Sequence, residues 1–273
     1  MRSLRESEVD SRRLVSFDAD TILLDPQLPR KLLRFLSPRI KGNHMRKSRA
    51  TRQRLIAIGD IHGHVKALRG ILEQIQPQAS DTIVTLGDCV NRGPESREVL
   101  DRLMELKQSC NLISILGNHD EMMLEGRNDP SALDRWMTQG GEATLKSYGE
   151  PQDLKNIPKS HWDFLSSFVP YYETDEFIFT HANYCWYNPM DQQESSLLRW
   201  YSLENQQPKA HISGKIVIMG HTPGPVRDVG HYCCIDTGCG LGGILTAKEV
   251  QIGEYWHSTE SGEVAGSEDN QFV

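Results

Sequence analysis

Residues 59–64 read Gly-Asp-Ile-His-Gly-His and follow a short apolar run, Arg54–Ile58, that is typical of a buried strand. Two similar segments begin 28 and then 30 residues further along the chain. They are residues 87–93, Gly-Asp-Cys-Val-Asn-Arg-Gly, after Thr82–Leu86, and residues 117–120, Gly-Asn-His-Asp, after Leu112–Leu116. Each motif carries carboxylate, amide or imidazole groups, which bind divalent metals. Because the motifs share one strand-then-loop setting, they indicate a common site.

Helical patterns separate these three predicted strands. Residues 64–75 have apolar side chains at helical spacing, and a second helix is predicted with Pro94 in its first turn and an apolar face that continues to Leu106. The order β-α-β-α-β favours a parallel sheet with right-handed crossovers. Ligands of such sheets bind beyond the carboxyl ends of the strands, which is where all three motifs lie.

The second half of the chain reads differently. Residues from about 121 to 170 predict a polar helical insert beside the site, with Trp136, Trp162 and Phe164 as packing anchors. Turn-rich spacing after the insert favours a second, mixed sheet packed on the first. Its predicted strands are Glu176–Thr180, Lys215–Met219, His231–Asp236, Gly243–Thr246 and Glu249–Trp256. His181 and His221 follow the first two of these strands in Thr-His-Ala and Gly-His-Thr.

Composition excludes several classes of protein. No apolar run approaches the roughly 20 residues that cross a bilayer, and the charged N-terminus has no secretory signal pattern. The six cysteines form no CxxC pair, which argues against a structural zinc or thioredoxin-type site. A cytoplasmic, reducing location is therefore expected. Cys89, beside a predicted metal ligand, is expected to be a buried apolar filler rather than a redox group.

Charge is distributed unevenly along the chain. Residues 1–54 hold 14 basic and 6 acidic residues, whereas the remainder holds 16 basic and 31 acidic residues. Residues 1–52 are therefore predicted to be a basic leader that is mobile or partly helical, with one short helix at Arg30–Leu36, and Met45 is an alternative start. Residues 53–256 are predicted to form the catalytic domain, and residues 257–273 a mobile tail. Nucleic acid is not expected as a partner except through the leader.

The motifs can be assembled into a two-metal site. Asp60 and His62 are two residues apart, so extended backbone would point both side chains toward one metal. Asp88 can bridge two metals through its two oxygens. The second metal would be completed by Asn118, His181 and His221. Two such metals polarise a phosphoryl group and generate a bridging hydroxide that attacks phosphorus directly. Taken singly, Asn118 would also fit a helix cap, and each histidine a buried core position.

These residues carry a family resemblance. The ordered motifs, with residues 140–149 and 235–247, resemble the bacterial branch of the phosphoprotein phosphatase family, within the calcineurin-like metallophosphoesterases. The resemblance covers about residues 54 to 250. It implies a four-layer α/β/β/α sandwich of two mixed sheets with flanking helices. It also implies two divalent metal ions, with manganese preferred and iron, zinc, nickel or cobalt as alternatives.

The resemblance also assigns roles. One metal would be held by Asp60, His62 and Asp88, and the other by Asp88, Asn118, His181 and His221. His119 would protonate the leaving group or orient the substrate. Arg92 would grip the phosphoryl oxygens through its planar fork of donors. Arg199 is the candidate for a second phosphate-binding arginine.

One position departs from the family pattern, because Asn91 stands where the second motif normally has a second Asp. In the family, that carboxylate accepts a hydrogen bond from the histidine that matches His119. Asn91 is predicted to accept the same bond through its amide oxygen without contributing charge. We therefore expect a less basic His119, weaker general-acid catalysis and an activity optimum at lower pH. Asp120 is adjacent, but neighbours along an extended segment point apart.

The leading functional hypothesis is a metal-dependent serine/threonine protein phosphatase that also accepts phosphotyrosine or small phosphoesters. Within the same superfamily, the alternative is a symmetrical dinucleoside polyphosphate hydrolase, which needs a slot for a base. Six aromatic residues could line such a slot, and each could equally be core: Tyr148, Trp162, Tyr184, Trp186, Tyr187 and Trp200. A binding or regulatory protein with a site weakened by Asn91 is the hypothesis from a different class.

Overall fold

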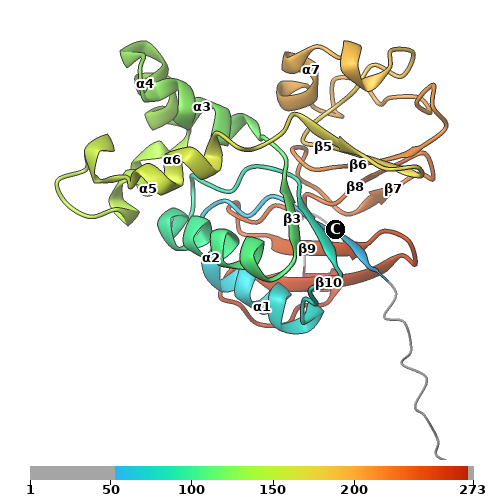
Figure 1. Ribbon diagram of the computed structural model, residues 1–273, viewed down its shortest axis with the longest axis horizontal. Coiled ribbons are helices and arrows are strands. Elements are labelled where there is room, and N and C mark those ends of the chain that lie inside the picture. The colour runs from blue at the N-terminus through green and yellow to red at the C-terminus, as the bar shows by residue number, and fades with distance from the viewer. Residues whose placement is uncertain (1–52, 270–273) are drawn as a thin grey trace, which may run out of the picture. The chain divides into compact units, whose positions relative to one another are not determined.

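The β-α-β-α-β order predicted for the first three motifs is present in the computed structural model, which describes residues 53–269 (Figure 1). Strands β1 (Leu55–Ile58), β2 (Thr82–Thr85) and β3 (Asn111–Ser114) are parallel neighbours. Helices α1 (Val65–Ile75) and α2 (Ser96–Ser109) connect them. The predicted leader, residues 1–52, lies outside the described residues.

The first sheet is extended by two strands from the far end of the domain. Strand β9 (Ile244–Glu249) pairs antiparallel with β1, and β10 (Glu254–Thr259) pairs antiparallel with β9. The strand order is therefore β10-β9-β1-β2-β3. The last two strands of the chain thus extend the sheet beyond β1. Strand β1 lies between β9 and β2.

The second sheet has the order β4-β5-β6-β8-β7. Strands β5 (Phe177–Thr180), β6 (Ile216–Met219) and β8 (Tyr232–Cys234) are parallel, and they form the centre of the sheet. Short antiparallel strands, β4 (Tyr171–Glu173) and β7 (Arg227–Asp228), form its edges. The mixed second sheet that the sequence predicts is therefore present.

Alternating side chains separate three cores and so define the layers. In β1, Ile56 and Ile58 pack toward α1 and α2, while Leu55 and Ala57 face the second sheet. In β5, Phe179 faces the first sheet and Ile178 packs toward the outer layer that includes α7 (Ser195–Trp200). The four-layer α/β/β/α sandwich is confirmed, with both sheets stacked between the helical layers (Figure 1).

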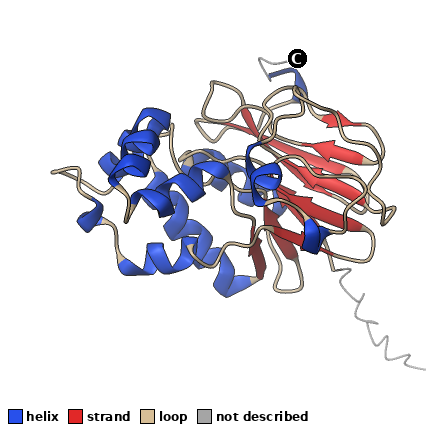
Figure 2. Cartoon of the chain, turned by 90° about the horizontal axis from the view of Figure 1, so that it is seen from above, coloured by secondary structure: helices blue, strands red, loops and turns tan. Residues whose placement is uncertain are grey.

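The helical insert lies to one side of the sandwich (Figure 2). Its predicted anchors are in the core: Trp136 is fully buried, and Trp162 and Phe164 are nearly so. Pro158 precedes its last helix. The segments are α3 (Asn118–Gly126), α4 (Pro130–Trp136), the π-helical turn η1 (Met137–Gly141), α5 (Glu142–Ser147), η2 (Leu154–Asn156) and α6 (Lys159–Leu165).

Several predictions about the C-terminal strands were wrong. The strands predicted at 243–246 and 249–256 are in fact 244–249 and 254–259, and they belong to the first sheet rather than the second. The predicted boundary at residue 256 therefore falls inside β10. The tail predicted from residue 257 is also wrong at its start, because residues 257–259 belong to β10. Ser258 and Ala265 are buried, and Ala265 N–H donates to the His257 carbonyl.

Smaller differences concern element boundaries. The short edge strands β4 and β7 were not predicted, because neither has a clear apolar alternation. Pro94 lies before α2 rather than in its first turn, since the helix begins at Ser96. Within residues 53–269, no helix is long and apolar enough to cross a membrane.

Candidate metal centre

The carboxyl ends of the parallel strands from both sheets converge on one cluster of polar side chains. Asp60, Asp88 and Asn118 follow β1, β2 and β3, and His181 and His221 follow β5 and β6. All five are nearly or fully buried except His221, which is half-buried. Contributions from both sheets explain why residues 161 positions apart in sequence meet, as when His221 N–H donates to Asp60 Oδ2 at 3.1 Å.

The loops of this cluster are held in left-handed backbone conformation. Among the described residues, six non-glycine positions have positive φ, and five of them lie in these motifs: His62, Asp88, Asn91, Arg92 and His221. Such conformations are costly for residues with a Cβ and persist only where the surrounding structure enforces them. The extended backbone assumed for residues 60–62 is therefore wrong, because the chain turns at His62, where φ is 45°.

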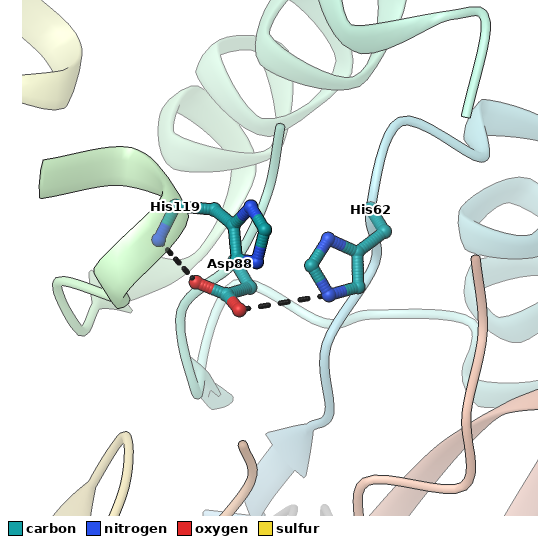
Figure 3. A group of neighbouring side chains, drawn as sticks. All are labelled: His62, Asp88 and His119. Atoms are coloured by element: carbon teal, nitrogen blue, oxygen red, sulfur yellow. Dashed lines mark hydrogen bonds and ion pairs between the residues drawn. The ribbon is translucent and has the colours of Figure 1, made fainter. Parts of the chain in front are cut away.

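Asp88 stands between two groups of potential metal ligands. One group consists of His62, Asp88 and His119, and the other of Asp88, His181 and His221; within each, one ligand atom per residue lies within 4.8 Å of the others. His62 Nε2 is 3.5 Å from Asp88 Oδ2, whereas His181 Nε2 is 3.5 Å from Asp88 Oδ1. The two carboxylate oxygens thus face different groups, as a bridging ligand requires. Figure 3 shows the first group, with the His119 backbone N–H also donating to Asp88 Oδ1.

Beside the second group, Asn118 Oδ1 and His181 Nε2 face each other without a proton between them. His181 Nδ1 donates to the Leu86 carbonyl at 2.8 Å, so a neutral ring keeps its lone pair on Nε2. That Nε2 lies 3.0 Å from Asn118 Oδ1 and 3.1 Å from His221 Nδ1, and the last two atoms are 3.1 Å apart. Asn118 Oδ1 and His181 Nε2 both present lone pairs at 3.0 Å, so binding a shared cation is more favourable than their direct contact. The residues present therefore fit a divalent metal.

Histidine orientation supports the same conclusion. His62 Nδ1 donates to the Val90 carbonyl at 3.1 Å, which leaves Nε2 directed at Asp88. Histidines that bind metals commonly donate their second N–H to a carbonyl or carboxylate, which fixes the tautomer and the ring. His62 and His181 follow that pattern.

Buried carboxylates give the cluster an unfavourable concentration of negative charge. Burial, followed by the charges of Asp236 and Asp88, raises the pKa of Asp60 well above its usual range. Burial also raises the pKa of Asp236 to about 6, although Gly238 N–H donates to its Oδ1 at 2.9 Å. Burial opposes ionisation of Asp88 as well, but the surrounding histidines lower its pKa below the ordinary value. Bound cations would relieve this repulsion.

Asn91 contacts His119 in the orientation opposite to the predicted one. Its Oδ1 accepts from Trp136 Nε1 at 2.8 Å and from Thr144 Oγ1 at 3.0 Å. Because an indole N–H is only a donor, the oxygen must face Trp136, and Nδ2 then lies 2.8 Å from His119 Nδ1. The amide therefore donates to His119 instead of accepting from it. Burial, and the charge of Arg92, keep the pKa of His119 below its usual value.

Asp120 does not compensate for Asn91. Its oxygens accept from the backbone N–H groups of Cys89 and Gly117, so it points away from the His119 ring. Burial raises its pKa to about 7. Asp120 caps the start of α3 by accepting from Gly117 N–H. Asn118 is therefore not needed as a helix cap, and its side chain faces the cluster. Cys89 is fully buried, and burial raises the pKa of its thiol well above the usual range, as expected of a packing residue.

The two predicted arginines contact different residues. Arg92 is exposed, and its Nη1 donates to His62 Nε2 at 2.8 Å while Nη2 is 3.3 Å from His119 Nε2. Arg199, in α7, is largely buried and pairs through Nη2 with Glu121 Oε1 at 2.6 Å. Its Nε has no hydrogen-bond partner among the described residues. Arg92 thus contacts two histidines of the first group, whereas Arg199 is paired with Glu121 of α3.

The sequence prediction missed two contributors. Asp236 follows β8 in the same way that His181 follows β5, but it was assigned to the strand itself and not to the site. Trp136 was predicted only as a packing anchor, yet it also fixes the amide of Asn91. The strand-end rule could have found Asp236 had β8 been predicted to end at Cys234. No sequence signal connects Trp136 with Asn91, which is 45 residues away.

Acidic residues and histidines gathered in this way, between two stacked sheets, define the centre of a metal-dependent hydrolase. The family model described as calcineurin-like phosphoesterase matches residues 53–241, and the chain belongs to that family. Members use divalent metal ions, and the protein is a phosphoric ester hydrolase. Assignment to the bacterial phosphoprotein phosphatase branch stays a prediction.

Three similar proteins refine the comparison. A symmetrical bis(5'-nucleosyl)-tetraphosphatase of Aliivibrio fischeri (strain MJ11) is 26% identical, covering 73% of this chain and 96% of that protein. The crystal structure of a putative diadenosine tetraphosphatase has a TM-score of 0.60 at 24% identity, over 77% and 95% of the two chains. A cold-active protein tyrosine phosphatase has a TM-score of 0.53 at 16% identity, over 80% of each chain. At these identities, the two solved structures show a shared fold.

Proposed function

We propose that the protein is a two-metal hydrolase that cleaves bis(5'-nucleosyl) tetraphosphates symmetrically. The observation that carries the reaction class is Asp88, whose two oxygens face separate groups of potential ligands. Support for the substrate comes from the tetraphosphatase of Aliivibrio fischeri, which matches along nearly its whole length. This substrate was the alternative in the sequence analysis, and the relatives favour it over the leading hypothesis of a protein phosphatase.

The donor set suggests how two ions would be held. Asp60, His62 and Asp88 would bind one, and Asp88, Asn118, His181 and His221 the other. Carboxylate, amide and imidazole ligands suit manganese, which we propose as the metal, although iron, zinc, nickel and cobalt accept the same groups. When bound, two such ions supply Lewis-acid polarisation of the phosphoryl group and a water of lowered pKa.

The remaining residues have roles that follow from their positions. Arg92 is exposed beside His62 and His119, so its guanidinium can leave His62 and present paired donors to phosphoryl oxygens. His119 Nε2 faces the same side as Arg92 and is the group that would orient or protonate the leaving oxygen. Asn91 acts through His119 by fixing its ring. Arg199, paired with Glu121 of α3, would contribute positive charge.

Location is a further proposal. All six cysteines are free thiols, and four of them are buried. Unpaired cysteines support a reducing compartment, in line with the predicted cytoplasm.

A comparison of substrates tests the proposed function. The manganese-loaded protein is assayed with diadenosine tetraphosphate, p-nitrophenyl phosphate and a phosphoserine peptide. We expect kcat/KM to be highest, by at least about a hundredfold, for the tetraphosphate, because only that substrate engages both arginines and a base site. A higher kcat/KM for the phosphopeptide would reinstate the protein phosphatase hypothesis.

A further inference from the structure

Trp200 is an exposed aromatic residue at the edge of the metal centre. Of the six aromatic residues that could line a base slot, Tyr148, Trp162 and Tyr184 are buried in the core. Trp200, by contrast, keeps 42% of its surface exposed at the last position of α7. An exposed tryptophan beside a buried polar centre offers a stacking surface that the hydrolytic chemistry itself does not need.

Two hydrogen bonds fix the end of α7 against the second ligand group. Ala182 N–H, next to His181, donates to the Leu198 carbonyl at 2.7 Å. The Thr180 hydroxyl, on the other side of His181, donates to the same carbonyl at 3.3 Å. Trp200 therefore lies two residues after a carbonyl that both sequence neighbours of His181 hold.

The indole itself is held in place through Glu121. Trp200 Nε1 donates to Glu121 Oε2 at 2.8 Å, while Glu121 Oε1 pairs with Arg199 Nη2 at 2.6 Å. Glu121 lies on α3, one turn after Asn118, so the indole is braced to the helix that starts at the centre. A ring that is held by its edge and remains partly exposed loses little conformational entropy when a planar group stacks on it.

We propose that Trp200 is the stacking surface for one nucleobase of the substrate, a specificity subsite that rests on the proposed function. In symmetrical cleavage of a bis(5'-nucleosyl) tetraphosphate, the reacting phosphorus is joined to the base through one further phosphate and a ribose. A base at Trp200 would thus lie just beyond the metal centre. Stacking accepts any base, because every base has a π-face, so this subsite would select nucleotides without selecting among them.

Arg199 supplies the charge that such a substrate needs on this side. Its side chain is 11% exposed, and Glu121 occupies only one of its amino groups, while the buried Nε has no partner among the described residues. The neighbouring positions 199 and 200 thereby combine a cation with an aromatic face, which matches the phosphate and base of one nucleoside diphosphate unit.

Equilibrium binding tests the subsite directly. Binding of adenosine diphosphate and of inorganic pyrophosphate to the manganese-loaded protein is measured by calorimetry, for wild type, W200A, W200F and Y187A. Tyr187 is the matched control, because it is 62% exposed and its ring contacts Trp186. We expect W200A to weaken adenosine diphosphate binding about tenfold and pyrophosphate binding less than twofold. W200F, which keeps an aromatic face, should lose less than threefold, and Y187A should resemble wild type.

The outcomes separate this inference from the proposed function. Equal weakening of both ligands in W200A, no weakening of either, or a wild type without preference for the nucleotide would each overturn the subsite. If wild type hydrolyses diadenosine tetraphosphate symmetrically but Trp200 does not affect nucleotide binding, the subsite alone fails. If wild type does not hydrolyse it, yet W200A abolishes the preference for adenosine diphosphate, the subsite stands and the proposed function fails.

Discussion

Asn91 donates to His119: the amide nitrogen lies 2.8 Å from His119 Nδ1, and the amide oxygen is held by Trp136 Nε1. A neutral imidazole that accepts at Nδ1 carries its proton on Nε2. Protonation of Nδ1 would place two donors face to face. The network therefore disfavours the imidazolium ion, in the same direction as burial and the nearby charge of Arg92, both of which lower the pKa of His119.

Replacing Asn91 by Asp should raise activity at alkaline pH. A carboxylate can accept from Trp136 through one oxygen and from His119 Nδ1–H through the other, so it stabilises the imidazolium. A general acid is lost as the pH rises through its pKa, and a higher pKa moves that loss to higher pH. We expect the alkaline limb of the kcat profile of N91D to move upward and kcat at pH 8 to rise about tenfold.

The matched variant for this prediction is N91L, which has a similar size but neither donates nor accepts. It should show a lower kcat without an upward move of the alkaline limb. An unchanged profile in N91D, with metal content equal to that of wild type, would contradict the role given to Asn91.

Gly117 packs directly against Asp88, so it allows a test of the bridging role of Asp88. A Cβ at this position would collide with Asp88 Oδ1 and with the Asp88 backbone nitrogen. We predict that G117A weakens manganese binding about 10- to 100-fold although every ligand is retained, because the bridging carboxylate must shift. The control is G214A, where no atom lies within 4 Å of the new methyl group, although φ is +74° there and −84° at Gly117. Equal manganese affinity in both variants, measured by calorimetry, would be evidence against Asp88 as the bridge.

Arg92 should affect catalysis more than metal binding. Its planar guanidinium offers paired donors that an ammonium group cannot reproduce. R92K is therefore expected to lower kcat/KM about 100-fold for tetraphosphate and p-nitrophenyl phosphate alike, with two metals still bound per chain. Elemental analysis alongside the kinetics provides the check. Loss of metal in R92K would mean that Arg92 is structural.

Removal of metal should make stability depend on the ionisation of Asp236. In the metal-free protein its pKa is raised to about 6 from the ordinary 3.8, so the folded state binds the proton more tightly than the unfolded state. The free energy of unfolding then falls as pH rises between these values, by about 3 kcal/mol for this group. With EDTA, the stability difference between D236N and wild type should change by that amount from pH 4 to pH 7 in chemical denaturation. With manganese, the change should disappear, and its persistence would contradict the proximity of Asp236 to the metals.

Much of the site could be predicted because its chemistry is local in sequence. Each motif directly follows a strand whose apolar residues are contiguous, so the parallel sheet and the edge that carries Asp88 and Asn118 could be inferred. Placement of His181 and His221 needed only the assumption that the second sheet stacks on the first with its carboxyl ends at the same edge.

The rest depends on contacts that sequence patterns do not encode. Strand β9 joins the first sheet by pairing with β1, about 190 residues earlier, and its apolar pattern fits either sheet. The orientation of Asn91 depends on Trp136, which donates to it from the position just before the turn η1. The position of Trp200 likewise involves a contact remote in sequence, because its Nε1 donates to Glu121, 79 residues earlier.

Product analysis of diadenosine tetraphosphate hydrolysis in ¹⁸O-labelled water tests the central claim most directly. The manganese-loaded protein should yield two adenosine diphosphates, one of them carrying a single ¹⁸O, and D88N should yield none above about a thousandth of that rate. Formation of adenosine monophosphate with adenosine triphosphate, or full activity in D88N, would contradict the account.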